Sequence, residues 1–371
     1  MKCCICVKKP TNIFTNGCFQ QSLYIWKMLN FIPGIECDMV TVESDYDTFD
    51  DLIDVKIKQL TRTSVTQYQI VFMLSLALNV VNEGDILKVI KQNGIKLIDI
   101  LCGNLFILLQ EEFVFNCHNI MKNYRNEYID EVWVLEMYDY AREFLEMVYA
   151  KPVKVLPYVW DTDIIRTYLA MNKIVIPDKP NNDKINICVY EANMSLHKNA
   201  YNPLLIAETY YKRNPDKLNK VFVFCKEKMF NNGFYEKLEI VKNGKIEFHG
   251  RMIMPTTLDL LTKQTGYKNV VLSHTFLNNL NFIHLELFYM KVQIVHNCEP
   301  FSKNGLYYDT FNLYRAVELL EKARREEPSV NDTIDIICKF NCKNEEIQNK
   351  WSKEMNDLLL SNLRPKVSVK S

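Results

Sequence analysis

The sequence predicts an α/β fold made of two doubly wound units, each with a parallel sheet. Short apolar runs alternate with amphipathic stretches of about 10–15 residues, which is the pattern of βαβ units. A polar, proline-marked segment at 173–184 separates two such series and indicates a linker. A chain of 371 residues, 48% of them hydrophobic and 24% charged, is long enough to form two domains.

The first series occupies residues 1–172 and is expected to form an N-terminal, Rossmann-like domain. Its strands are predicted at 2–7, 36–42, 69–73, 96–101, 131–135 and 153–157. The longest strongly apolar stretch, 70–81, holds twelve residues, whereas a membrane-spanning helix needs about 20. It therefore predicts a buried element, and we expect no transmembrane segment.

The second series occupies residues 185–330 and is expected to form a second Rossmann-like domain. Its strands are predicted at 184–190, 220–225, 246–249, 269–273 and 292–296, and its helices at 202–213, 226–235, 255–265 and 281–290. Residues 331–371 are predicted to be helical. Within 345–363, Ile347, Trp351 and Met355 recur at helical spacing, so this segment is expected to pack back on the first domain.

Composition excludes several classes of protein. Lys and Arg (45) balance Asp and Glu (45), so no general field attracts nucleic acid. The first ten residues contain no signal-peptide h-region, which predicts a cytoplasmic protein with reduced, buried thiols among its twelve cysteines.

Neither a G-x-G-x-x-G dinucleotide motif nor a G-x-x-x-x-G-K-[ST] P-loop occurs. Cys338 and Cys342 lack a second ligand pair, so we expect no metal site there.

Ligands of open parallel sheets bind beyond the carboxyl ends of the strands, so the loops that follow strands hold the first candidates. Asn16-Gly17 and Gly103-Asn104 stand in two such loops of the first domain. Lys198 stands in the loop after the first strand of the second domain, just before a helix, where a cation suits a diphosphate. The alternatives are glycines that serve only as turns and a solvated lysine.

The richest cluster of polar residues covers 273–297. Its candidates are His274, Thr275, Asn278, Asn281 and Glu286. Glu286 follows Asn278 by eight positions, about two helical turns, so both side chains can point to one side. Glu286 lies among apolar residues, where an unpaired carboxylate is costly, and two ribose hydroxyls would offset that cost. An internal salt bridge or a surface-facing side chain is the alternative.

This cluster resembles the carboxylate motif of the GT-B-fold glycosyltransferases, especially the retaining family 4 and its uncharacterised bacterial relatives. In that motif two glutamates eight positions apart precede a strand. Asn278 and Glu286 stand at their places here, and Lys291 stands where the family has a glycine. The resemblance implies that Glu286 binds the ribose of a nucleotide sugar. It extends over most of the chain, from about residue 12 to about residue 320.

Three other loops are similar to loops of the same family. Segment 189–199 is similar to the loop that ends in a phosphate-binding lysine, here Lys198, although Glu191 lies near the place of the usual upstream arginine. Asn16-Gly17 resembles the N-terminal glycine loop that approaches diphosphate and acceptor. Gly103-Asn104 is similar to a loop of the uncharacterised bacterial relatives.

The resemblance implies a GT-B architecture, in which the two domains face a central cleft and the second holds the nucleotide sugar. The activity it implies is transfer of a sugar from a UDP or GDP donor to a hydroxyl of a glycan or other acceptor, without a metal ion or further cofactor. His118 and His274 are candidates for sugar contacts or proton handling, since imidazole titrates near neutral pH. The alternatives are an inactive nucleotide-sugar-binding protein on the same scaffold and a sugar-nucleotide epimerase.

Overall fold

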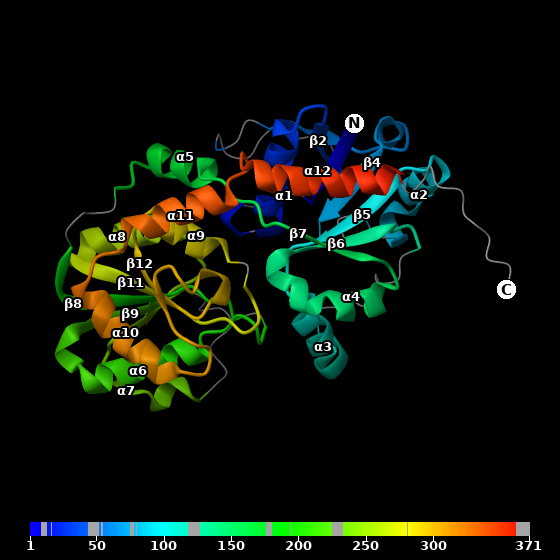
Figure 1. Ribbon diagram of the computed structural model, residues 1–371. Helices are drawn as coiled ribbons and strands as arrows, with labels where there is room; N and C mark the ends of the chain where they lie inside the picture. The colour runs from blue at the N-terminus through cyan, green and yellow to red at the C-terminus, as the bar shows by residue number, and fades with distance from the viewer. Residues whose placement is uncertain are drawn as a thin grey trace. The chain divides into compact units, whose positions relative to one another are not determined.

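A computed structural model of the chain contains two α/β units (Figure 1). The structure describes residues 1–8, 13–15, 17–43, 52, 55–74, 78, 80–117, 127–175, 180–193, 195–224, 233–279 and 281–360. Unit 1 consists of Met1–Asp161 together with the chain from Cys338 onward, and unit 2 of Thr162–Ile337. Among the described residues, no helix is both long and apolar enough to cross a membrane.

Unit 1 is built on a seven-stranded parallel sheet with the strand order β3-β2-β1-β4-β5-β6-β7. Its strands are β1 Lys2–Cys6, β2 Glu36–Thr41, β3 Ile57–Gln59, β4 Ile70–Leu74, β5 Lys96–Leu101, β6 Glu131–Leu135 and β7 Val153–Leu156. Its helices are α1 Gly17–Phe31, α2 Val80–Gln92, α3 Leu105–Phe115, α4 Arg142–Tyr149 and α12 Glu345–Leu360, with 3-10 turns at Ile13–Thr15, Ser64–Gln67 and Glu136–Ala141.

The central strands of this sheet are buried on both faces, which explains their continuous apolar runs. Every residue of β4 is buried. Cys3, Cys4 and Cys6 of β1 are fully buried, and burial raises the pKa of the Cys4 thiol well above its ordinary value. The eleven described cysteines are all free thiols, and most of them pack as small apolar side chains.

Helix α12 closes one face of unit 1. Trp351 is fully buried, and its indole Nε1 donates to Pro157 O at 3.2 Å. The centroid of its ring lies 5.8 Å from that of Trp133. Helices α2 and α4 pack against the strands in a separate apolar cluster that contains Leu87 and Leu145. Residues 345–360 thus pack against the sheet of unit 1, although unit 2 separates them from it in the sequence.

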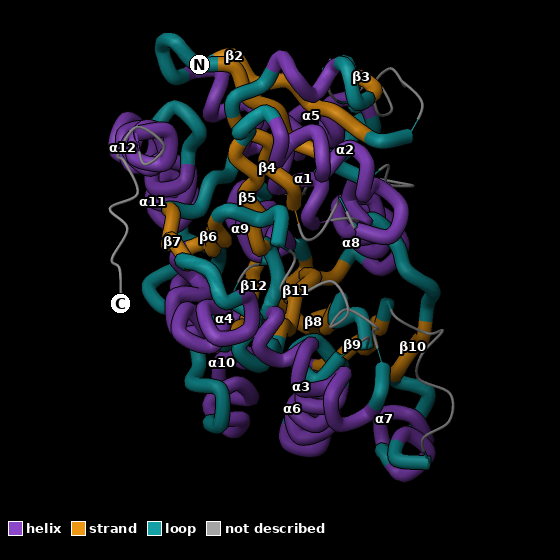
Figure 2. Tube along the Cα trace, turned by 90° about the vertical axis from the view of Figure 1, so that its right-hand side faces the viewer, coloured by secondary structure: helices purple, strands orange, loops and turns teal. Residues whose placement is uncertain are grey.

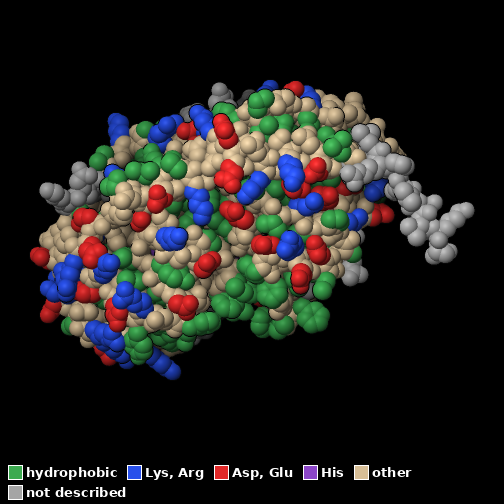
Figure 3. Space-filling view, viewed as in Figure 1, with side chains coloured by type: hydrophobic (Ala, Val, Ile, Leu, Met, Phe, Trp, Pro, Cys, Tyr) green, Lys and Arg blue, Asp and Glu red, His purple; other side chains and the backbone are tan. Residues whose placement is uncertain are grey.

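One apolar part of unit 1 stays exposed. Helix α3 is apolar nearly all round, and Phe113, Val114 and Phe115 at its end are 81%, 67% and 65% exposed. Figure 3 shows hydrophobic side chains gathered on the surface where Figure 1 places α3 and α4.

Unit 2 is built on a six-stranded parallel sheet with the order β10-β9-β8-β11-β12-β13. Its strands are β8 Asn181–Val189, β9 Leu218–Val223, β10 Ile246–Phe248, β11 Tyr267–Ser273, β12 Gln293–His296 and β13 Leu306–Tyr307. Its helices are α5 Asp163–Met171, α6 Tyr201–Arg213, α7 Glu239–Lys242, α8 Met254–Thr265, α9 Phe282–Tyr289, α10 Leu313–Arg325 and α11 Val330–Phe340. The last residues of α11, from Cys338 on, belong to unit 1. Unit 2 also has 3-10 turns at Pro215–Lys217, Tyr235–Lys237 and Glu299–Phe301.

Helices cover both faces of this second sheet. Helices α6, α7 and α10 lie along one face, and α8, α9 and α11 along the other (Figures 1 and 2). The prediction of two parallel-sheet α/β units is confirmed.

The structure differs from the sequence-based expectation in three places. Strands β3 and β13 were not expected, because β3 has one buried residue followed by two exposed ones and β13 has only two residues, too few for a periodic pattern. Most of the helix expected at 226–235 lies outside the described residues. The units change at Asp161, not in the expected linker at 173–184, because α5 groups with unit 2 and β8 already begins at Asn181.

Candidate functional site

The candidate site lies at the carboxyl ends of β8 and β11, where the strand order of unit 2 reverses. After β8 the chain continues to β9 on one side, and β11 pairs on the other side. Such a reversal opens a crevice between the loops that follow the two strands. Here the loops are joined, because Lys198 forms isolated backbone bridges with both Ser195 and Thr275. The backbone thereby brings Lys198 and Thr275 together.

The lysine in this crevice is desolvated. Lys198 precedes α6 by three residues, and its Nζ lies 3.5 Å from Asn281 Oδ1, a long contact. Burial lowers the pKa of Lys198, while the charge of Glu191 opposes that shift. Asn281 occupies the N-cap position of α9, yet its side chain does not cap the helix. The expected start of a helix after Lys198 is confirmed.

A buried carboxylate faces the same crevice. Glu191 is 3% exposed, and its Oε1 accepts hydrogen bonds from Ser273 Oγ at 2.7 Å and from the His274 backbone N–H at 3.2 Å. Burial raises the pKa of Glu191, and Lys198 and the two hydrogen bonds oppose that shift. Glu191 therefore reduces the positive charge that Lys198 presents.

Ser273 links Glu191 to a second buried group, His284. His284 Nε2 lies 2.9 Å from Ser273 Oγ, and because that hydroxyl donates to Glu191, the hydrogen-bond network assigns the imidazole proton to Nε2. His284 Nδ1 is buried and has no hydrogen-bond partner. Burial lowers the pKa of His284 far below its ordinary value, so the ring is neutral.

His274 is held at both ring nitrogens. Its Nε2 accepts from Asn202 Nδ2 at 2.9 Å, and its Nδ1 lies 3.0 Å from the Tyr308 hydroxyl, which donates to Ser273 O at 3.2 Å. Burial lowers the pKa of His274 to about 4. A neutral ring with both nitrogens engaged favours a positioning role over proton transfer at neutral pH.

Thr275 is fixed by its backbone. Asn297, just after β12, accepts from Thr275 N–H at 2.9 Å and donates to Thr275 O at 2.7 Å. The Thr275 hydroxyl donates to Asn278 O at 3.1 Å. This pairing holds the loop after β11 against the end of β12, and both Thr275 and Asn278 are buried.

Glu286 lies in the middle of α9 and is 4% exposed, so the alternative expectation that its side chain faces the surface is wrong. Asn278 and Asn281, at 4% and 7% exposure, are buried in the loop before the same helix. The structure brings Lys198 to Thr275 and Asn281, and Thr275 to Asn278. His274 and Glu286 lie in the same segment, from the end of β11 to α9.

The candidates of unit 1 do not form a comparable cluster among the described residues. Asn16 and His118 lie outside them, and Gly17 is the exposed first residue of α1. Asn104 is the N-cap of α3, and its side chain accepts from Ile107 N–H at 3.1 Å. Gly103 precedes this cap, and a Cβ there would meet nothing within 4 Å. Asn104 thus has a structural role.

Sequence reasoning did not assign a role to Glu191, His284 or Asn297. Glu191 and Asn297 stand after strands and His284 lies in α9, but their hydrogen-bond partners, Ser273 and Thr275, lie 11 to 82 residues away in the sequence, at the end of β11 and in the loop after it. Among the described residues, no group of three or more His, Cys, Asp or Glu is arranged to hold a metal ion.

Comparison with known proteins adds a family and a fold. Residues 3–354 match the family described as "Protein of unknown function (DUF2827)", and the chain belongs to that family. No curated protein matches the sequence.

Several solved structures are similar to the whole chain. Sucrose-phosphate synthase from Thermosynechococcus elongatus superposes with a TM-score of 0.59 at 10% identity, covering 97% of this chain and 99% of that one. The lipopolysaccharide outer core galactosyltransferase WaaB gives 0.56 at 12% identity, covering 96% and 100%. A UDP-forming α,α-trehalose-phosphate synthase from Burkholderia xenovorans gives 0.57 at 10% identity, covering 96% and 98%. The chain has the GT-B fold of these glycosyltransferases.

Proposed function

We propose that this member of the DUF2827 family is a glycosyltransferase that moves a sugar from a nucleoside diphosphate, with UDP as the favoured carrier, to an acceptor hydroxyl. The observation that carries the proposal is the desolvated Lys198 beside Asn281 at the strand-order reversal of unit 2, within a GT-B fold. UDP is favoured because one of the similar structures is a UDP-forming synthase.

In this reaction the bond from the sugar C1 to the β-phosphate oxygen breaks, and a bond from C1 to the acceptor oxygen forms. The acceptor proton leaves to the departing diphosphate or to solvent. Negative charge grows on the diphosphate as the bond breaks, so a fixed cation that meets it lowers the barrier. Lys198 supplies that cation, and its partial desolvation strengthens the interaction. The scheme needs neither a metal ion nor a further cofactor.

The remaining candidates would hold the donor. Glu286, buried in α9, would accept hydrogen bonds from the two ribose hydroxyls. Asn278 and Asn281 would contact the sugar and the diphosphate. His274, neutral and hydrogen-bonded at both ring nitrogens, would fix the backbone of this segment. Retention of the anomeric configuration follows from the family resemblance, and His118 stays a candidate for proton handling.

Glu191 favours a second candidate function, that of a nucleotide-sugar-binding protein without transfer activity. A buried carboxylate within electrostatic range of Lys198 reduces the net positive charge that a departing diphosphate would meet. The two functions predict the same ligands and differ in turnover.

Calorimetric titration with UDP, GDP and their sugars, combined with an assay of donor hydrolysis and transfer, tests both functions. For Lys198→Ala we expect about 10- to 100-fold weaker diphosphate binding, because a hydrogen bond to a charged group is lost, and a larger loss of turnover. Lys217→Ala, which removes an exposed lysine of the same unit, is the matched control and should change neither. Glu286→Ala should weaken nucleotide binding by about 1–3 kcal/mol.

Wild-type binding by a folded Lys198→Ala variant would remove the assignment of the diphosphate to Lys198. Nucleotide-sugar binding without hydrolysis or transfer to any hydroxyl acceptor would favour the inactive binder. Absence of binding to every nucleotide would overturn both functions.

A further inference from the structure

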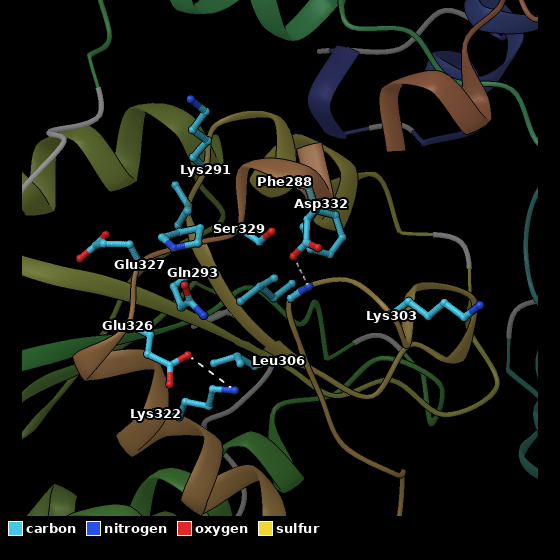
Figure 4. Close-up of a pocket in the computed structure, with 14 residues that line it drawn as sticks. Phe288, Lys291, Gln293, Lys303, Leu306, Lys322, Glu326, Glu327, Ser329 and Asp332 are labelled. Carbon is cyan, nitrogen blue, oxygen red and sulfur yellow. Dashed lines mark hydrogen bonds and ion pairs between the residues drawn. The ribbon is translucent and has the colours of Figure 1, made fainter. Parts of the chain in front are cut away.

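A pocket of about 210 Å³ lies at the amino-terminal start of β12, away from the crevice (Figure 4). Three lysines and three acids line it. Lys322 pairs with Glu326 at 3.5 Å, and Asp332 accepts from the Gly305 N–H at 2.7 Å. Such a lining selects no ligand by its charge. The exposed apolar surface of α3 and α4, in unit 1, is the better candidate for an interaction.

This surface, which we call the α3–α4 patch, consists of five exposed side chains. Phe113, Val114 and Phe115 stand at the end of α3. Tyr140, just before α4, is 47% exposed, and Met147, within α4, is 73% exposed. Figure 3 shows hydrophobic side chains gathered on the surface in this region. The patch therefore involves two helices and is more than a single exposed residue.

Contacts between the two helices make the patch continuous. The ring centroids of Phe106 in α3 and Phe144 in α4 lie 5.0 Å apart, with the rings edge to face. Phe113 follows Phe106 by about two helical turns, so both lie on one face of α3. Met147 follows Phe144 by about one turn of α4. The exposed side chains thus extend outward from one pair of packed rings.

The size of the patch suits an interface between proteins. A whole aromatic side chain has about 150–250 Å² of surface, so the five residues together expose roughly 600 Å². Apolar patches of more than a few hundred Å² mark interaction sites on soluble proteins. Two such patches packed face to face would bury roughly 1,200 Å² in total, the lower end of the range for specific interfaces. A second copy of the chain therefore supplies the area that a dimer needs.

The charges around the patch disfavour a membrane surface. Residues 105–115 and 136–151 contain six Asp and Glu but only two Lys and Arg. Glu143 and Glu146 are exposed in the same helix as Met147, and Arg142 pairs with Asp139 at 3.4 Å. Anionic lipids attract clusters of Lys and Arg, so an acidic border repels them. Two copies of the chain also repel each other through these acids, but salt screens exposed charges.

We propose that the α3–α4 patch is the interface of a two-fold symmetric homodimer, in which the patch of one copy packs against the same patch of the other. An apolar surface is complementary to itself, and a two-fold axis is the commonest symmetry of homo-oligomers. An interface at the lower end of the size range predicts a reversible dimer that forms at protein concentrations of about 10–100 µM. The dimer does not rest on the proposed transfer activity.

Sedimentation velocity of the full chain, over a hundredfold range of protein concentration, tests this proposal. The mean mass should rise with concentration from that of one chain towards that of two. Phe113→Asp should weaken the dimer about tenfold or more, because the interface would then bury a charge. Phe311→Asp is the matched control, since Phe311 of unit 2 is 83% exposed, and it should leave the dimer unchanged.

Salt dependence and hydrogen exchange identify the partner and the surface. Added salt should strengthen the dimer, because it screens the repulsion between the acidic borders, whereas it would weaken binding to an anionic membrane. Amide exchange in α3 and α4 should slow when the protein concentration is raised.

A monomer at every concentration would overturn the proposal. A dimer that persists when Phe113→Asp and Met147→Asp are combined would also overturn it, and because both residues are exposed, this variant should melt at the wild-type temperature. Binding to vesicles of phosphatidylcholine and phosphatidylserine that is lost in Phe113→Asp, without a dimer in solution, would overturn it as well and would assign the patch to a membrane.

Discussion

The two sheets have the same parallel construction, but the polar residues beyond their carboxyl ends are used differently. In unit 2, Glu191, Ser273 and His284 bond to one another and leave Lys198 desolvated beside them. In unit 1, the described polar residues of this region serve the fold. Asn104 caps α3, and Gln21 Nε2 donates to Val159 O at 3.1 Å.

This difference teaches where the fold tolerates unfavourable burial. A buried carboxylate, a desolvated, half-buried lysine and neutral histidines each cost stability, and unit 2 holds all three kinds within one crevice. A helix cap such as Asn104 carries no such cost, although Gln21 Oε1 of unit 1 is also buried without a partner. The crevice of unit 2 is therefore the better candidate for chemistry among the described residues.

The largest expected effect that separates the units is acid destabilisation. All five histidines of the described chain lie in unit 2, and burial lowers the pKa of His274 and of His296 to about 4. The unfolded state binds more protons between pH 6.5 and 4, so the free energy of unfolding falls as pH falls through that window. At pH 5 each of the two histidines should cost about 2 kcal/mol relative to pH 7.5.

Urea unfolding at pH 7.5 and pH 5.0, with hydrogen exchange corrected for intrinsic rates, measures this loss by region. Unit 2 should lose protection first. Earlier loss in unit 1 would contradict the assignment of the acid-sensitive groups.

A smaller effect compares two glycines with left-handed backbones. In unit 2, Gly305 has φ +62°, and a Cβ there would lie 3.0 Å from Phe288 Cε1 and 3.3 Å from His296 Nε2. In unit 1, Gly94 has φ +64° and nothing within 4 Å. Gly305→Ala should cost about 3 kcal/mol, from strain plus overpacking, and Gly94→Ala about 1 kcal/mol, from strain alone. Equal melting temperatures for the two variants would show that the contacts at Gly305 relax freely.

The smallest effect compares two helix caps, for which the units should behave alike. Asn104 accepts from Ile107 N–H in unit 1, and Asn312 accepts from Arg315 N–H at 3.2 Å in unit 2. Replacing either by alanine should cost about 1 kcal/mol in urea unfolding. If Asn104→Ala instead left stability unchanged but altered transfer to acceptors, Asn104 would belong to a binding site and the contrast between the units would fail.

Much of the fold could be predicted from the sequence because buried parallel strands have a strong local pattern. The run at 96–101 is the whole of β5, and residues 131–135 are the whole of β6. Strand β13 could not be predicted, since Leu306 and Tyr307 alone carry no period and join the sheet by pairing with β12.

The site could be predicted only in part. Lys198 and Asn281 were candidates because each lies between a strand and a helix, but their proximity depends on the pairing of two loops.

The return of α12 to unit 1 has a consequence for the order in which the protein is made. Trp351 packs against Trp133 and Pro157, and Cys342 donates to Asp161 at 2.7 Å, so unit 1 stays incomplete until the ribosome has added residues 338–360. Unit 2 is one continuous segment, 162–337, and has emerged by then. Domains fold as units during synthesis, which means that the second unit can finish folding before the first has its last helix.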